Sequence, residues 1–158
     1  MTYKVEGVKG DVTFKTNGDG HTEHVKVEGL ELGDGQKSPY IQGQVGRESM
    51  AEIRDWDPDV VPPDYDGGHL IARLFDGIGE RINTVGMLKE LNRSSVNRKN
   101  FYRIEMQLRD KLLEVPPPKI DLEIDVIRTP GLKTPALFIV NAWERGKVFI
   151  DEDFVNVQ

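Results

Sequence analysis

The sequence predicts an α+β fold in which an antiparallel sheet packs against one main helix. Short stretches of alternating apolar residues occur near both ends of the chain, and a single long amphipathic segment lies between them. The predicted elements follow one another as strands, long loop, hairpin, helix and strands. This order indicates an antiparallel arrangement, because a parallel sheet would require helices to alternate with strands.

The first fifty residues are predicted to form short strands. Val12 and Phe14, and then Val25 and Val27, alternate with polar residues, which is typical of strands with one buried face. The segment between these pairs, Asn-Gly-Asp-Gly at 17–20, is a strong hairpin-turn signal. We therefore expect two neighbouring antiparallel strands here.

Proline and aspartate dominate residues 54–66, which contain three prolines and five aspartates. Proline lacks a backbone donor and favours extended geometry in the residue before it, so the segment is predicted to be a structured loop. The sequences HLIARLF at 69–75 and RINTV at 81–85 follow. With a glycine-rich turn at 76–79, they predict a β-hairpin.

The main helix is predicted over residues 95–114, with Ser94 or Ser95 as its N-cap and a proline run at 116–118 ending it. Its apolar stripe consists of Phe101, Ile104, Leu108 and Leu112. Alternation after the helix predicts a strand over 120–126 and then a hairpin formed by 136–143 and 147–155. These strands give the helix a sheet to pack on.

Length and composition limit the possible functions. The chain has 158 residues, which suits a single domain over 1–158, and its 0 cysteines exclude disulfides and cysteine nucleophiles. No apolar run approaches the roughly 18 residues that a membrane span needs, and no signal-peptide pattern opens the sequence. The net charge of −6 disfavours passive binding of nucleic acid, so that function would need a basic patch or a metal ion.

His69 is the first candidate functional residue. A histidine near a strand is more often a hydrogen-bonded structural residue than a catalytic one. Here, however, Gly67 and Gly68 allow a close approach to the backbone, and Asp66 is near enough in sequence to orient or charge-balance the imidazole. This setting favours a functional role for His69.

The predicted helix carries the second candidate pair. Asn97 and Glu105 are eight residues apart, with Phe101 midway, so all three lie along the flank of the apolar stripe. A carboxylate beside a buried seam needs a partner or a function. The structural alternative is a cap at Asn97 and an ion pair from Glu105 to Arg109, and the helix alone does not decide between them.

Basic residues cluster in the same region. Residues 89–111 contain seven basic and three acidic residues, a local charge of +4. This segment is where a phosphate backbone could dock, although a solvated helix face would have a similar composition.

Three segments together resemble the DNA/RNA non-specific endonuclease family: DGGHLIARLF at 66–75, INTV at 82–85 and VNRKNFYRIE at 96–105. The core of that family is the ββα-metal, or His-Me finger, motif. It consists of the tetrapeptide Asp-Arg-Gly-His, a hairpin, and a helix that opens with Asn and carries an aromatic residue and Glu. The resemblance covers about residues 54–127.

The matching positions are Asp66, Gly68 and His69 in the tetrapeptide and Asn97, Phe101 and Glu105 in the helix. Two positions depart from the pattern. Gly67 stands where many members carry Arg, so a phosphate contact is missing or comes from Arg54, Arg73 or Arg103. A few extra residues precede the helix and make Asn92 a rival to Asn97 as metal ligand.

The resemblance implies hydrolysis of DNA or RNA with little sequence preference. It assigns His69, Asp66 and Glu105 to catalysis. A single Mg²⁺, with Mn²⁺ as an alternative, is expected at Asn97 or Asn92, with Glu105 reaching it through water. The residues expected to contact phosphate are Arg73, Arg98 and Arg103.

The resemblance also implies the nuclease tip of a secreted bacterial toxin, delivered into a target cell as part of a longer protein and blocked in the producer by an immunity protein. The alternative is a catalytically degenerate module that binds nucleic acid or protein. Gly67 supports this alternative, because many family members carry Arg at this position. An acidic inhibitor domain is a third interpretation, and it would show no metal dependence.

Overall fold

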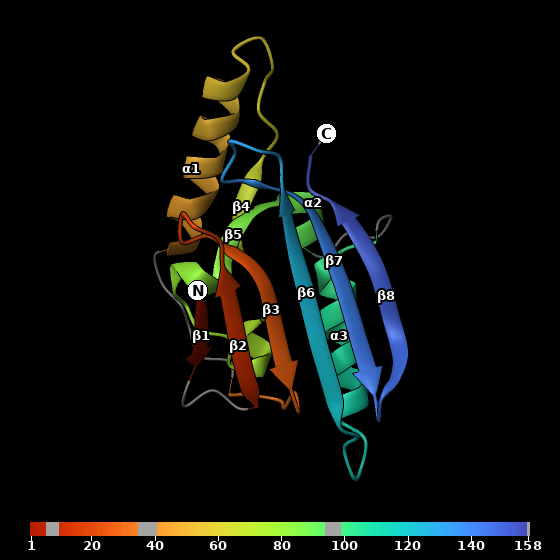
Figure 1. Ribbon diagram of the computed structural model, residues 1–158. Helices are drawn as coiled ribbons and strands as arrows, with labels where there is room; N and C mark the ends of the chain where they lie inside the picture. Colours follow the sequence, from red (N-terminus) through yellow and green to blue (C-terminus); the bar gives the residue numbers. More distant parts are fainter. Residues whose placement is uncertain (6–9, 35–40, 94–98, 158) are drawn as a thin grey trace.

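The computed structural model describes residues 1–5, 10–34, 41–93 and 99–157 (Figure 1). Its largest element is a six-stranded sheet in which all neighbouring strands are antiparallel, in the order β1-β2-β3-β6-β7-β8. The strands are β1 (Thr2–Val5), β2 (Asp11–Thr16), β3 (Thr22–Glu28), β6 (Ile120–Arg128), β7 (Pro135–Glu144) and β8 (Lys147–Val155). The α+β class and the strands expected at both ends of the chain are confirmed.

Helix α3 (Phe101–Leu112) covers one face of the β6–β8 half of this sheet (Figure 1). The four residues of the predicted apolar stripe are all buried. The ring centroid of Phe101 lies 5.2 Å from that of Phe138 on β7 and 5.1 Å from that of Phe154 on β8. The helix therefore packs through the stripe that the sequence predicted.

A second layer contains a two-stranded sheet, β4 (Tyr65–His69) and β5 (Thr84–Leu88), and helix α1 (Ile41–Trp56). The short helix α2 (Lys89–Asn92) follows β5 directly. The predicted hairpin is thus present, but its strands lie elsewhere than expected. Residues 70–83 form the connection and contain two 3₁₀ turns, Arg73–Phe75 and Arg81–Asn83.

The shift of the hairpin has a local cause in Asn83, which is completely buried. Its side chain accepts a hydrogen bond from Ile71 N and donates to the carbonyl oxygens of Ile71 and Ile78. These bonds satisfy backbone groups that would otherwise pair across a ladder, so the apolar run after His69 leaves the sheet. His69 consequently ends a strand, whereas the sequence placed it at a strand start.

Helix α1 shows that two predictions from the sequence were wrong. The prediction of one main helix was incomplete, because α1 has 16 residues and α3 has 12. The predicted loop at 54–66 is also shorter than expected, since α1 continues to Trp56 and β4 begins at Tyr65. Gly43 and Gly46 lower the helix propensity of this segment and hid it from analysis of the sequence.

Asn156 joins the two layers. It is completely buried, and its side chain donates to Gly86 O on β5 and to Pro135 O on β7 at 2.9 and 2.7 Å. The same side chain accepts a hydrogen bond from Leu88 N at 2.8 Å. The backbone carbonyl oxygen of Asn156 accepts a further hydrogen bond from Tyr65 Oη. One residue near the end of the chain thus fixes the β4–β5 hairpin against the large sheet.

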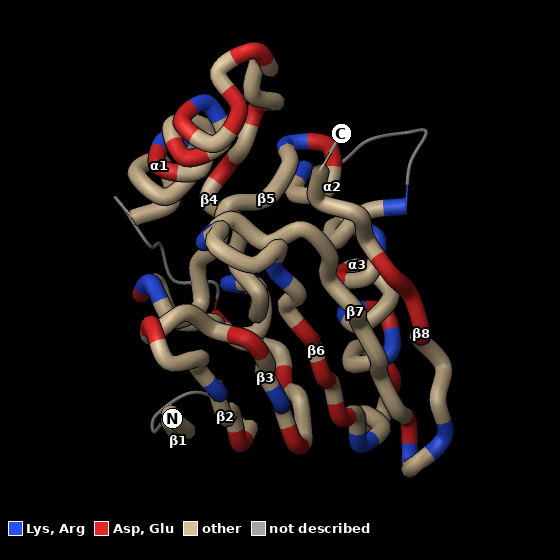
Figure 2. Tube along the Cα trace, turned by 45° about the horizontal axis from the view of Figure 1, so that its top comes forward, with Lys and Arg blue, Asp and Glu red and all other residues tan. Residues whose placement is uncertain are grey.

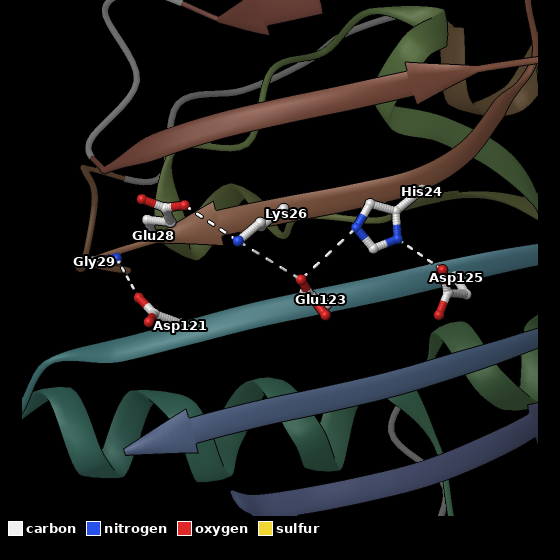
Figure 3. A network of polar contacts seen from close by, with 7 residues as sticks. All are labelled: His24, Lys26, Glu28, Gly29, Asp121, Glu123 and Asp125. Atoms are coloured by element: carbon white, nitrogen blue, oxygen red, sulfur yellow. Dashed lines mark hydrogen bonds and ion pairs between the residues drawn. The ribbon is translucent and has the colours of Figure 1, made fainter. Parts of the chain in front are cut away.

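The face of the sheet opposite α3 carries charged side chains from β3 and β6 (Figure 3). His24 Nδ1 lies 2.7 Å from Asp125 Oδ1, and Lys26 lies between Glu28 and Glu123. Each of these pairs is solvent-accessible, so its contribution to stability is small. Among the described residues, no helix has the length and apolar character required to cross a membrane.

Candidate nuclease site

His69 lies at the end of β4 and is buried, with 7 % of its surface exposed. Its Nδ1 atom is 3.0 Å from Nε2 of Gln42 on α1. Its Nε2 atom is buried and has no hydrogen-bond partner within the described chain. Burial, and secondarily the positive charge of Arg73, hold the pKa of His69 below its ordinary value. The imidazole is therefore neutral near pH 7, as a general base must be.

Helix α1 reaches His69 because glycines allow it to lie directly on the hairpin. A Cβ atom on Gly46 would lie 2.6 Å from Tyr65 O, and one on Gly86 would overlap the side chain of Ser49. A Cβ atom on Gly67 would overlap the backbone of Gln42. The departure of Gly67 from the Asp-Arg-Gly-His pattern thus has a structural cause, since the backbone of α1 occupies the space that a side chain would need.

Asp66 contacts other residues than the sequence suggested. Its carboxylate accepts two hydrogen bonds from Arg93, at 2.8 and 2.9 Å, and one from Asn92 Nδ2 at 3.1 Å. Burial raises the pKa of Asp66, but these hydrogen bonds outweigh it and leave the pKa below its ordinary value. Residues three apart on a strand face opposite sides. The contact expected between Asp66 and His69 is therefore replaced by the one from Gln42.

The start of α3 also differs from the prediction. Asn100 has an extended backbone and caps the helix, with its side chain accepting a hydrogen bond from Arg103 N. The helix therefore begins at Phe101, six residues after the predicted start at 95. Asn97 and Arg98, with the predicted caps at 94 and 95, lie outside the described residues. An uninterrupted helical spacing from Asn97 to Glu105 is excluded, because Asn100 breaks it.

Glu105 lies on α3 beside the buried face of the helix. Burial raises the pKa of Glu105 to about 7. The ion pair expected from Glu105 to Arg109 is absent, because Arg109 pairs with Asp110 at 3.2 Å. In the part of the chain that the structure describes, no hydrogen bond or ion pair reaches the Glu105 carboxyl group. A partly buried carboxyl group with a raised pKa and no partner among the described residues is a candidate functional group.

The donor groups fit a hard divalent cation that keeps most of its water. Such an ion takes oxygen ligands, and the Glu105 carboxyl group is a partly buried oxygen donor with no partner among the described residues. The described residues contain no group of three or more His, Cys, Asp or Glu that could hold a metal ion.

Glu105→Gln is expected to stabilise the metal-free protein at high pH. Because the folded pKa is about 7 and the unfolded pKa is near 4.5, stability from this group is lost as the pH rises from about 4.5 to 7. Glutamine removes this loss, so the unfolding free energy should rise by up to about 3 kcal/mol at pH 8. Urea unfolding at about pH 4 and pH 8 measures the difference.

The exposed Glu31→Gln is the matched control and should change stability by less than about 0.5 kcal/mol at either pH. Equal stability of the Glu105→Gln variant and the natural protein at pH 8 would show that the carboxyl group is not desolvated.

Most of the predicted basic cluster is neutralised by carboxylates. Lys89 pairs with Asp64, and Lys111 with Glu144. Arg93 forms an ion pair with Asp66, and Arg109 forms one with Asp110. Acidic residues also recur along β6 (Figure 2). The described residues therefore offer a phosphate fewer cations than the local charge of +4 suggested. Arg73, partly buried beside His69, and the exposed Arg103 are the described members of the predicted phosphate-contact set.

A surface cavity of about 1000 Å³ lies on the other flank of α1. Glu48, Glu52 and Trp56 of the helix line it together with Arg81 and Arg128. No predicted site residue that the structure describes lines this cavity, although Thr84, which pairs with His69 across the β4–β5 ladder, does.

The sequence model of the DNA/RNA non-specific endonuclease family matches residues 3–144. The chain belongs to this family. The match spans most of the chain, including β4, β5 and α3, so the family resemblance inferred from the sequence is confirmed. The endonuclease fold described above is therefore that of an enzyme acting on nucleic acids.

Two kinds of relative support the assignment. This endonuclease is 29 % identical over 127 residues to the type VII secretion system protein EssD of Staphylococcus aureus, in strains USA300 and NCTC 8325 / PS 47. The match covers 80 % of this chain but 19 % of EssD, so the chain spans about a fifth of that relative. NucA from Streptococcus agalactiae, crystallised with no metal bound, superposes with a TM-score of 0.67 at 14 % identity. That match covers 96 % of this chain and 73 % of NucA, and it establishes the shared fold.

Gln42 is the site residue that analysis of the sequence missed. It lies 27 positions before His69, in a segment expected to be strand. Gly43, Gly46 and Gly67 were the available signal, because glycines in two segments can indicate close packing of one backbone on another.

Proposed function

We propose that this endonuclease hydrolyses phosphodiester bonds of DNA, and of RNA, with little sequence preference and with a divalent cation as cofactor. The observation that carries the proposal is the neutral, buried imidazole of His69 at the end of β4, beside the cationic Arg73. Neutral histidine can accept a proton from water, and general-base assistance of this kind contributes about 10²–10⁴ in rate.

The other predicted site residues have distinct tasks in this proposal. Asp66 holds Arg93 and Asn92 and so fixes the start of the segment between β5 and α3. Arg73 offers a positive charge to a phosphate beside the imidazole. Arg98 and Arg103 would contact further phosphates, and because phosphate contacts carry no base information, little sequence preference is expected.

Mg²⁺, or Mn²⁺ in its place, would be held by the side-chain oxygen of Asn97 or Asn92, with Glu105 acting through water. When bound, the cation supplies charge stabilisation for the phosphorane-like transition state and the leaving oxygen. The unpartnered carboxyl group of Glu105 supports this assignment, because a nearby cation would favour its ionised form.

The similarity to part of EssD supports a role as the nuclease domain of a secreted bacterial toxin. Such a domain would be exported within a longer protein, act on the nucleic acid of a target cell, and require an immunity protein as inhibitor in the producing cell. The alternative is a catalytically degenerate binding module, but Gly67 no longer argues for it, because the packing of α1 on β4 gives a structural reason for this glycine.

Incubation of supercoiled plasmid with the protein tests the proposal directly. With Mg²⁺ or Mn²⁺ we expect progressive degradation to short fragments, and with excess chelator we expect intact plasmid. A structured RNA in parallel reactions tests the second substrate. Intact DNA and RNA at high protein concentration with either metal would refute the nuclease, and undiminished cutting in chelator would refute the metal requirement.

A further inference from the structure

The two ring nitrogens of His69 have different surroundings. Nε2 is buried, with less than 1 Å² accessible, and within the described residues no donor or acceptor lies within hydrogen-bond reach of it. Nδ1 is in contact with the amide of Gln42 at 3.0 Å. The Gln42 amide belongs to a side chain, so its movement away would open Nδ1 to a water molecule, whereas Nε2 is buried.

The identity of the contacting atom determines where the ring proton lies. A neutral imidazole carries one proton, on one nitrogen, and has one in-plane lone pair on the other. Gln42 Nε2 is a donor only, so a hydrogen bond to Nδ1 requires the lone pair at Nδ1 and the proton at Nε2. The contact thus selects one of the two tautomers.

Gln42 is held in place by its backbone rather than by its side chain. The Gln42 backbone lies directly on Gly67, and Gly46 one turn later lies on the carbonyl of Tyr65. Gly86 admits Ser49 in the same way on β5. Three close contacts between α1 and the hairpin therefore fix the position of the Gln42 backbone relative to β4.

We propose that Gln42 is a positioning residue that keeps His69 in the tautomer whose lone pair lies on Nδ1, the nitrogen that a water molecule can reach. This inference rests on the proposed role of His69 as proton acceptor. The amide occupies the single lone pair of Nδ1, so the water to be activated takes its place when substrate binds. The other tautomer would hold its lone pair on the buried Nε2 and could not accept a proton from that water.

The tautomer is measured by two-bond ¹H–¹⁵N spectra of protein labelled with ¹⁵N-histidine, near pH 8 where the ring is neutral. The chain has 3 histidines, and the His69→Ala variant identifies the third signal. We expect the natural protein to show a protonated Nε2 and an unprotonated Nδ1. Gln42→Glu replaces the donor by an acceptor, so the proton should move to Nδ1. Gln42→Met removes the donor without adding charge and should give signals of both tautomers.

Gln44→Glu is the matched control, because Gln44 lies on the same helix, is exposed, and receives the same change in charge. Its spectrum should equal that of the natural protein, and its cleavage rate should agree within about twofold. Gln42→Glu should lower the cleavage rate by at least about 100-fold, because the lone pair is moved to a nitrogen that water cannot reach. Circular dichroism and thermal melts establish that each variant is folded.

The outcomes separate this inference from the proposed function. A proton on Nδ1 in the natural protein, or a tautomer unchanged in both Gln42 variants, would overturn the role of Gln42 whether or not the protein cleaves DNA. The predicted tautomers in a protein without nuclease activity would support the role of Gln42 in setting the tautomer and refute the proposed function.

Discussion

His69→Ala is expected to lower the rate of plasmid cleavage by at least about 100-fold, because the proton acceptor for the attacking water is lost. Binding of Mn²⁺ and of DNA should persist, since the imidazole is assigned to neither. Initial rates of conversion of supercoiled plasmid measure the loss, and electron paramagnetic resonance of free Mn²⁺ measures metal binding. Because His69 is buried, His69→Asn, which retains more of the side-chain volume, is the second variant.

His24→Ala provides the matched control for this experiment. His24 lies on the outer face of the large sheet, where it contacts Asp125 (Figure 3). Its removal should leave the cleavage rate unchanged within about twofold, because it contacts only surface charges. Normal cleavage by both folded His69 variants would overturn the assignment of the base.

Gly67→Arg would restore the tetrapeptide common in the family, yet we expect it to destabilise this protein by about 3 kcal/mol. The new Cβ atom would overlap the backbone of Gln42, so the start of α1 must move away from β4. For a chain of this size the melting temperature should fall by roughly 6–12 °C. Nuclease activity should fall as well, because Gln42 moves away from His69. Thermal melts and plasmid assays measure both effects.

Gly18→Arg is the control for Gly67→Arg. Gly18 lies in the β2–β3 turn, and a Cβ atom there would meet nothing within 4 Å. The same substitution at this position should therefore shift the melting temperature by no more than about 2 °C. If Gly67→Arg were as stable as Gly18→Arg, the close packing of α1 on β4 would be wrong.

The parts of the fold that were predictable depend on periodic burial. The strand over 120–126 and the stripe of α3 were recognised because every second residue, or every third and fourth, faces one core. Helix α1 has three buried residues, two of which are Gly46 and Ser49, so its buried face has almost no apolar signal. Close approach of backbones holds it in place together with Val45, Met50 and Ile53, which are buried or packed against the core.

In the candidate site, too, the sequence predicted the feature that depends on a local motif and missed the one that depends on the tertiary fold. The local motif at 66–69 was sufficient to find His69, but the sequence could not show that Gln42 contacts it, because only the tertiary fold brings α1 to β4. The prediction of a helix from 95 failed because Asn100 competes for the backbone of the first turn. Asn and Ser occur throughout 92–100, so the sequence alone offered several equivalent caps.

The position of Asn156 has a consequence for synthesis of the protein. On the ribosome, β4 and β5 emerge long before residue 156, and until then the amide of Leu88 and the carbonyl of Gly86 lack their buried partner. The hairpin bearing His69 therefore gains this joint only after residue 156 has been made, and a chain terminated before that residue lacks it.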